Sequence, residues 1–233
     1  MLRGRDIQKY LPEFHDLCLI YIPKGFTIKS ILALDENIIT EPIPRYGYVE
    51  YVNAWRWFEN KFPIIAEYLF QFKNIAEKRT DMGDYWWEQR ACAYLNSFTN
   101  PKIIYPELTK FLNFSLDIDK HYYTNNKNFI FTGVNLYYLV SFFNSRLWRF
   151  CFRDNFPELL GGTRELRKVF FEQIKVKKIT DEQEKSYKER ITKIIQLKEK
   201  NLNTKQLEDE LDQMIYQLYE LTDEEINIVE NSV

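Results

Sequence analysis

The sequence has little cysteine, histidine or glycine, and each scarcity excludes a class of protein. Its three cysteines, Cys18, Cys92 and Cys151, are widely spaced and odd in number, which argues against a disulfide framework and fits a reducing cytoplasm. The only histidines, His15 and His121, lie outside any metal-ligand spacing, so we expect no metal site. No segment reaches the roughly 18 consecutive apolar residues of a membrane span, and no signal-peptide pattern opens the chain. We therefore expect a soluble, cytoplasmic protein without a membrane partner.

The motifs of several enzyme classes are also missing. A methyltransferase that acts on amino groups holds S-adenosylmethionine against a glycine-rich turn, but none of the 7 glycines stands in such a pattern. The nearest match to its Asn-Pro-Pro-aromatic element, Asn100-Pro-Lys-Ile103, lacks the second proline and the ring. Glu59-Asn-Lys61 matches half of a magnesium-nuclease motif, yet it falls in a predicted helix whereas that motif normally occupies a strand. We expect no catalytic residue, no metal and no cofactor in this chain.

The net charge of −2 hides an uneven distribution of charge along the chain. Residues 1–178 contain 25 Lys and Arg against 20 Asp and Glu, whereas residues 179–233 contain 7 against 14. This distribution fits a protein whose residues 1–178 face a polyanion such as DNA and whose C-terminal tail is acidic. Aromatic residues make up 17% of the chain. Such rings either build a thick core or stack on nucleic-acid bases.

Local patterns predict a mixture of helices and strands. Apolar runs between turn residues predict strands at residues 16–22, 102–105, 114–118 and 129–132. Residues 43–72 predict two helices, and the second begins at its favoured first residue, a proline at position 63. This second helix is expected to present one apolar face, made by Ile64, Ile65, Tyr68, Leu69 and Phe72. A further helix is expected from a cap at residue 135 through residue 150. Without a regular βαβ rhythm, the pattern indicates the α+β class.

The composition changes near residue 180. Apolar residues recur at helical spacing over residues 181–200 and 207–218, and the polar segment 201–204 separates the two stretches. This pattern predicts a helical hairpin, and Thr222-Asp-Glu-Glu225 predicts a capping box that opens a last short helix. We therefore expect a mixed domain over residues 1–178 and, over residues 179–233, a C-terminal helical hairpin that acts as a spacer or packing element.

Two segments combine cations with glycine or aromatic residues. Arg3 and Arg5 flank a glycine, which lets the backbone approach a phosphate closely; the alternative is that both are solvated turn residues. Trp86, Trp87 and Arg90 combine ring faces with a guanidinium fork that can read guanine. The alternative for this second segment is a buried aromatic face with one salt-bridged arginine.

A third segment is the strongest candidate for contact with DNA. It is a flexible turn with three cations, formed by Gly161, Gly162, Arg164, Arg167 and Lys168. Glycine loses the most conformational entropy on ordering, so two in succession suggest that the backbone passes close to another surface. We expect Arg164 to contact phosphate, so that its replacement by alanine weakens binding with little loss of folding stability.

Several segments, taken in order, resemble the C-terminal specificity domain of TaqI-like adenine methyltransferases, which also occurs in type IIG restriction-modification enzymes. The similar segments are Leu2–Ile7, Tyr85–Arg90, Pro101–Glu107, Phe129–Gly133, Asn135–Leu139, Phe143–Leu147, Leu160–Arg167, Phe171–Ile174 and Glu208–Ile226. The resemblance covers nearly the whole chain. Residues 35–80 match nothing in it, and divergence is expected there because target sequences differ. It implies a parent protein with a catalytic methyltransferase domain that holds S-adenosylmethionine and, in type IIG enzymes, a nuclease domain that uses magnesium.

The sequence thus predicts a non-catalytic domain that binds double-stranded DNA and directs adenine-N6 methylation by a separate catalytic domain. That catalytic partner belongs to the same parent polypeptide or forms a separate subunit. Two other interpretations remain open. In the first, the chain is a protein-interaction module that works through its acidic hairpin. In the second, it is a nuclease with a degenerate carboxylate site.

Overall fold

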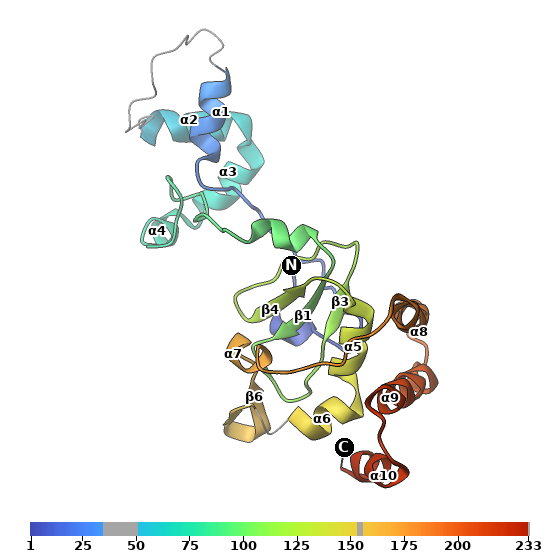
Figure 1. Cartoon of the computed structure of the whole chain (residues 1–233). Coiled ribbons are helices and arrows are strands. Elements are labelled where there is room, and N and C mark those ends of the chain that lie inside the picture. The colour runs from blue at the N-terminus through green and yellow to red at the C-terminus, as the bar shows by residue number, and fades with distance from the viewer. Residues whose placement is uncertain (35–50, 153–155, 233) are drawn as a thin grey trace. The chain divides into compact units, whose positions relative to one another are not determined.

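The computed structural model of the chain describes residues 1–34, 51–152 and 156–232 (Figure 1). The chain forms two compact units. Unit 1 contains Met1–Cys18 and Tyr94–Val233, and unit 2 contains Leu19–Ala93, so unit 2 is inserted between two parts of unit 1 along the chain. Helices occur together with small antiparallel sheets, which confirms the predicted α+β class.

A three-stranded antiparallel sheet in the order β3-β1-β4 forms the centre of unit 1. Its strands are β1 (Lys102–Pro106), β3 (Ser115–Asp117) and β4 (Asn128–Thr132), so the three strands predicted in this region are confirmed. All five residues of β1 are buried, which makes this strand the middle of the core. Pro106 at the end of β1 pairs with Asn128 at the start of β4. These two strand ends therefore lie at the same end of the sheet.

A second sheet, in the order β2-β6-β5, was not predicted. Its strands are β2 (Leu108–Thr109), β5 (Glu158–Leu159) and β6 (Thr163–Glu165). Strands of two or three residues are too short to leave a periodic pattern in the sequence. A three-residue loop, the 3-10 turn η4 (Leu160–Gly162), joins β5 to β6, and the short helix α7 (Lys168–Phe171) follows β6.

The helix predicted from Asn135 through Phe150 is wrong as a single helix. It consists of α5 (Leu136–Asn144) and α6 (Arg146–Phe152), separated at Ser145. Ser145 has an extended backbone, its hydroxyl donates to the Phe142 carbonyl at 2.7 Å, and it accepts from the Trp148 N–H at 3.1 Å. The serine thus closes one helix and caps the next.

Asn135 precedes α5 as predicted, but its side chain makes no cap hydrogen bond and its φ is 57°. The carboxylate of Glu184 accepts the N–H groups of Tyr137 and Tyr138 instead, at 3.1 and 3.0 Å. This acceptor lies 47 residues further along the chain, so the local sequence around Asn135 does not reveal it.

The C-terminal helices are α8 (Asp181–Glu199), α9 (Lys205–Tyr219) and α10 (Asp223–Asn231), which confirms the predicted hairpin. The capping box predicted at Thr222 and Glu225 is also confirmed. All three helices belong to unit 1 and add buried residues to its main core, namely Tyr187, Ile191, Ile194, Leu211, Ile215, Tyr216 and Val229. The chain does not divide by its contacts at residue 178, and a separate functional role for residues 179–233 stays a prediction.

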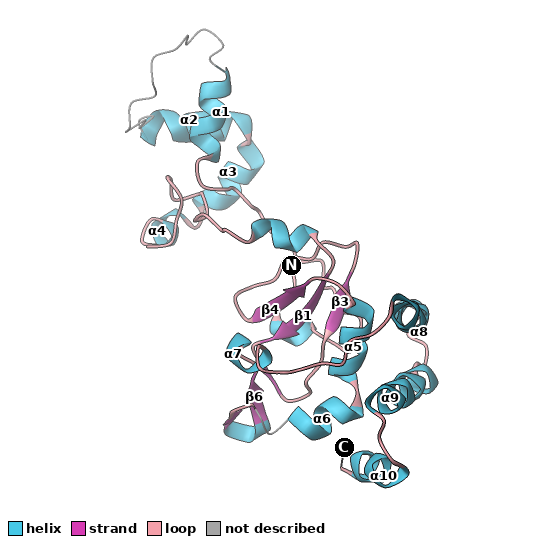
Figure 2. Ribbon diagram, in the orientation of Figure 1, coloured by secondary structure: helices cyan, strands magenta, loops and turns pink. Residues whose placement is uncertain are grey.

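The described part of unit 2 contains helices and loops around its own aromatic core (Figure 2). The helices are α1 (Phe26–Leu34), α2 (Tyr51–Lys61), α3 (Pro63–Phe70) and α4 (Lys73–Ala76). Proline stands at the first position of α3, as predicted. The part of the predicted helical region at residues 43–50 lies outside the described residues.

Two predictions on burial and strand formation in this region are wrong. Residues 16–22 form no strand, and most of them are exposed, because no neighbouring strand pairs with this apolar run in the described chain. The predicted apolar face of α3 is split. Ile65 and Leu69 pack against the core of unit 2, whereas Ile64 and Tyr68 are 82% and 51% exposed.

Candidate nucleic-acid interface

The N-terminal turn separates the roles of its two arginines. Arg3 donates from its guanidinium to the carboxylate of Asp6 at 3.0–3.2 Å, and its backbone N–H donates to the same carboxylate at 2.8 Å. Asp6 is 1% exposed. Burial alone would raise the pKa of Asp6, but hydrogen bonds from Arg3 outweigh it and hold that pKa below its ordinary value. The Arg5 side chain, by contrast, is 74% exposed. Of the two predicted contacts, Arg5 is therefore the accessible one, with only a long ion pair to Asp6 at 3.9 Å, and Arg3 shapes the turn η1 (Gly4–Asp6).

This turn is anchored beside the start of β4. The N–H of Leu2 donates to the Tyr123 carbonyl at 2.7 Å, and the N–H of Asn125 donates to the Leu2 carbonyl at 3.1 Å. A side chain at Gly4 would meet the Lys127 carbonyl and Pro106 at 3.7 Å. The turn therefore lies against the sheet end formed by Pro106 and Asn128, next to the exposed side chain of Lys127.

The glycine-containing turn is a β-hairpin rather than a flexible loop. Gly161 and Gly162 have φ values of 74° and 77°, a left-handed conformation that glycine adopts without strain. Arg164 pairs with Glu158 across the hairpin at 2.8 Å and donates to the Phe156 carbonyl at 3.2 Å. Its side chain is only 13% exposed. Arg164 therefore fastens the two strands together, a structural role that the sequence prediction did not assign to it.

The two other cations of this segment are exposed. The side chains of Arg167 and Lys168 are 61% and 77% exposed, and they pair with Glu165 at 2.8 Å and Glu172 at 3.2 Å. Ion pairs at such exposed positions stabilise a fold by about 0–1 kcal/mol. Exchanging these carboxylates for the phosphates of a ligand therefore costs little free energy.

Glu107 lies between two of the predicted DNA-binding segments, the N-terminal turn with Arg3 and Arg5 and the segment that ends at Arg167 and Lys168. Its N–H donates to the Lys127 carbonyl at 2.9 Å, and its own carbonyl accepts from the Leu166 N–H at 2.7 Å. The side chain of Glu107 pairs with Lys127 at 3.3 Å. The N-terminal turn packs on Lys127 and β6 ends beside Leu166, so the N-terminal turn and the base of the β5–β6 hairpin lie near each other at one end of unit 1.

We call this surface the cationic end. It consists of five exposed cations: Arg5, Lys110, Lys127, Arg167 and Lys168. Sequence reasoning missed Lys110 and Lys127. The ammonium nitrogen of Lys110 lies 3.7 Å from the place that a side chain on Gly161 would occupy. Nothing in the sequence marks these two lysines, because only the fold of β1, β2 and β4 places them beside the predicted turns.

The second predicted segment does not present its ring faces. Trp86 and Trp87 are each 4% exposed and lie in the core of unit 2. Tyr85 stacks on Trp87 with ring centroids 4.6 Å apart, and the Trp87 indole N–H donates to Thr27 at 3.0 Å. This conformation therefore matches the alternative of a buried aromatic face, and contact of these tryptophans with bases stays a prediction. Arg90 of the same segment is exposed.

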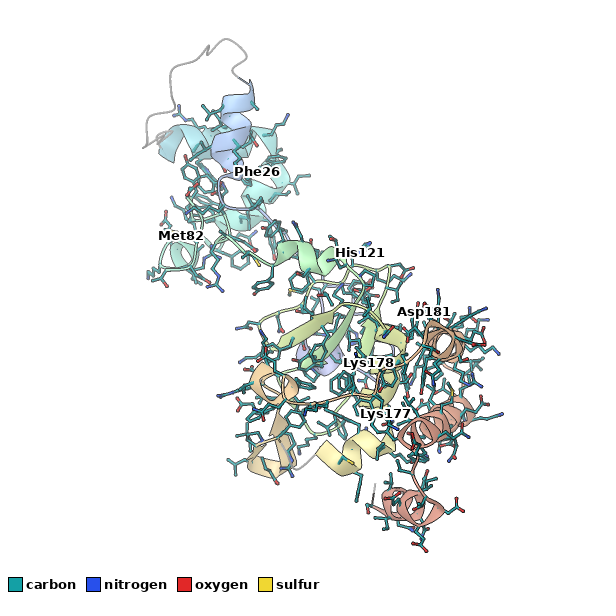
Figure 3. The ribbon with its side chains drawn as sticks, viewed as in Figure 1. Phe26, Met82, His121, Lys177, Lys178 and Asp181 are labelled. Carbon is teal, nitrogen blue, oxygen red and sulfur yellow. The ribbon has the colours of Figure 1, made fainter. Side chains whose placement is uncertain are left out.

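A buried carboxylate next to the tryptophans holds their segment in place. Glu88 is fully buried and accepts three backbone N–H groups, from Gly25 at 3.0 Å, Thr27 at 2.9 Å and Asp84 at 3.0 Å. A buried charge needs such partners to be tolerated. These bonds hold the N-terminus of α1, which includes Phe26 (Figure 3), against the segment that contains the tryptophans. Both tryptophans lie in the core of unit 2, and Phe26 packs against that core.

The basic surplus of the chain is confined to part of unit 1. Residues 1–18 and 94–178 contain 16 Lys and Arg against 10 Asp and Glu. Unit 2 contains 9 against 10, and residues 179–233 contain 7 against 14. The sequence segment with the surplus is the one that builds the cationic end.

Metal-binding side chains do not gather into a site among the residues that the structure describes. No group of three or more His, Cys, Asp or Glu residues there is arranged to hold a metal ion. The Glu59 and Lys61 pair lies on helix α2, as expected. None of the described helices has the length and apolar character needed to cross a membrane.

Fold and surface together define an α+β domain with an exposed cationic end. The family model of the TaqI-like C-terminal specificity domain matches residues 1–179. The chain belongs to this family, and membership supports a DNA-recognition domain of restriction-modification enzymes. The search of curated proteins found no match.

Proposed function

We propose that this chain is the sequence-specific recognition domain of a DNA adenine methyltransferase, either a separate methyltransferase or a type IIG restriction-modification enzyme. In this proposal the chain binds duplex DNA, and a catalytic domain outside this chain holds S-adenosylmethionine and methylates N6 of adenine. The observation that carries it is the proximity of the N-terminal turn and the cation-bearing segment after β6 at the cationic end, in a chain that belongs to a specificity-domain family.

The division of labour follows from the chemistry of base modification. A methyltransferase cannot reach the adenine amino group inside the base stack, so the base has to leave the duplex. A second domain that holds the duplex by its phosphates and reads neighbouring base edges keeps the site in register. Exposed arginine and lysine side chains beside a firmly anchored hairpin and turn suit this task. The chain itself is expected to transfer no methyl group from labelled S-adenosylmethionine and to cut no DNA.

Salt-dependent binding by the full chain tests this proposal. Log K for mixed-sequence duplexes is expected to fall against log salt with a slope of about −0.9 per phosphate contact. Arg167→Ala should lower the affinity and reduce that slope by about one contact. Lys205→Ala is the matched control, because Lys205 lies on α9 away from the cationic end and is 62% exposed and paired with Asp209, much as Arg167 is 61% exposed and paired with Glu165. Affinity that stays constant between low and physiological salt would refute the proposal.

A further inference from the structure

The hairpin of the second sheet carries an aliphatic side chain at its tip that nothing in unit 1 covers. Leu160 is 99% exposed, the highest value among the exposed large apolar residues of the described chain. It is the first residue of the three-residue loop between β5 and β6. The two residues after it are Gly161 and Gly162, and a side chain at Gly162 would meet no atom within 4 Å. The tip of the hairpin therefore presents the leucine side chain to solvent.

The base of this hairpin is firmly held, so the tip is a projection of a rigid element. Phe156 before β5 and Leu166 after β6 are 1% and 0% exposed. Arg164 joins the strands through Glu158, and the Leu166 N–H bonds to the Glu107 carbonyl at 2.7 Å. β6 pairs with strands on both of its edges. A tip anchored in this way can be pushed into a partner without the hairpin bending aside.

The surroundings of the tip favour DNA as the partner. Lys110 lies beside Gly161, and the exposed Arg167 and Lys168 follow β6 within a few residues. Apolar side chains that DNA-binding proteins insert between base steps occur among cations that hold the flanking phosphates. Left-handed glycines beside the leucine remove the side chains that would keep the backbone away from a groove.

We propose that Leu160 is an apolar wedge, which the β5–β6 hairpin inserts between two base pairs of the bound duplex. This inference rests on the proposed DNA-binding function and adds a positioning residue to it. The leucine partly unstacks one base step, and the covered aliphatic surface contributes affinity that does not depend on salt. The cations of the cationic end contribute the part that does.

The test uses the full chain and duplexes that it retains from a randomised pool. Leu160→Ser should lower the affinity at least about tenfold, because the apolar surface is no longer buried. The slope of log K against log salt and the melting temperature of the protein should not change, since Leu160 has no charge and no intramolecular cover. Leu160→Met keeps a large apolar side chain and should bind like wild type. Val134→Ser is the matched control, because Val134 is 80% exposed on unit 1 in the segment between β4 and α5.

Permanganate oxidation of thymines reports the unstacking itself. In a retained duplex with thymines in the protected segment, wild-type chain should make one thymine several-fold more reactive, and Leu160→Ser should abolish this change. Wild-type binding without a reactive thymine would overturn the wedge, as would equal affinity of wild type and Leu160→Ser. Retention of no duplex by the wild-type chain would instead overturn the proposed function, so the two failures are distinguishable.

Discussion

At the scale of single residues, exposure separates cations that hold the fold from cations that are free to bind. Arg3 and Arg164 are both committed to carboxylates of their own segment and are 28% and 13% exposed. Arg5, Arg167 and Lys168 are more than 60% exposed. The sequence places these residues in two short segments but does not distinguish the two kinds of arginine, because the distinction depends on which carboxylate lies opposite each one.

Replacing Arg164 by alanine tests this distinction. We expect Arg164→Ala to lower the free energy of unfolding by about 1 kcal/mol, since it removes the cross-strand pair and the hydrogen bond to the Phe156 carbonyl. Arg167→Ala should stay within about 0.5 kcal/mol of wild type, as surface substitutions usually do. Urea unfolding of both variants measures the difference. Equal stability of the two variants would contradict the structural role of Arg164.

At the scale of secondary-structure elements, signals that are local in sequence predicted the structure well. The proline that opens α3 and the capping box of Thr222 act within a few residues, and both are confirmed. The strand predicted at residues 16–22 failed because an apolar run becomes a strand only when a partner strand lies beside it. The exposure of Ile64 likewise depends on tertiary neighbours that no local pattern encodes. The helix break at Ser145 combines local bonds of the serine hydroxyl with a distant acceptor, Asp212, for the N–H of Arg146.

The cap that Glu184 of α8 provides for α5 is a prediction at this scale. Glu184→Ala should lower the free energy of unfolding by about 1 kcal/mol, because two N–H groups of the first turn lose their acceptor. Glu184→Gln keeps one acceptor oxygen and should lose less. Chemical denaturation of the two variants at neutral pH distinguishes them. Equal losses would mean that the side chain acts by packing and not as a cap.

The same residue has a defined pH dependence. Burial raises the pKa of Glu184, even though the Tyr137 and Tyr138 N–H groups act in the opposite direction. A carboxyl group whose pKa is higher in the folded chain contributes stability at acidic pH, and this contribution is lost as the pH rises through the folded value. The stability of wild type relative to Glu184→Gln should therefore decrease from acidic to neutral pH. An increase over that range would contradict this assignment.

At the scale of the whole molecule, the acidic helices are part of the fold of unit 1. The sequence alone suggested that residues 179–233 are a spacer or a packing element. In the structure Asp212 is 7% exposed and accepts the N–H of Arg146 at 2.8 Å, while Arg146 also pairs with Asp209 and Glu230. Lys177, just before these helices (Figure 3), pairs with Glu220 at 2.8 Å. Several acidic residues of this segment therefore hold unit 1 together.

Truncation after residue 178 tests this view. We expect the shortened chain to lose cooperative unfolding and to bind a hydrophobic dye, since seven buried core residues and the caps of α5 and α6 are removed. The full-length chain serves as the control in circular dichroism and dye binding. A truncated chain that unfolds cooperatively and keeps DNA binding would show that the helices are a dispensable spacer.

The central claim is that this chain recognises a particular DNA sequence while its cationic end holds the duplex. The most direct test is competition for the full chain, at physiological salt, between a duplex enriched from a randomised pool and variants of that duplex with single base-pair changes. We predict that a change at one of a few adjacent positions lowers the affinity by about tenfold, the usual cost of one mismatched pair. Changes outside those positions should have no effect. Equal affinity for every duplex would contradict sequence-specific recognition by this chain.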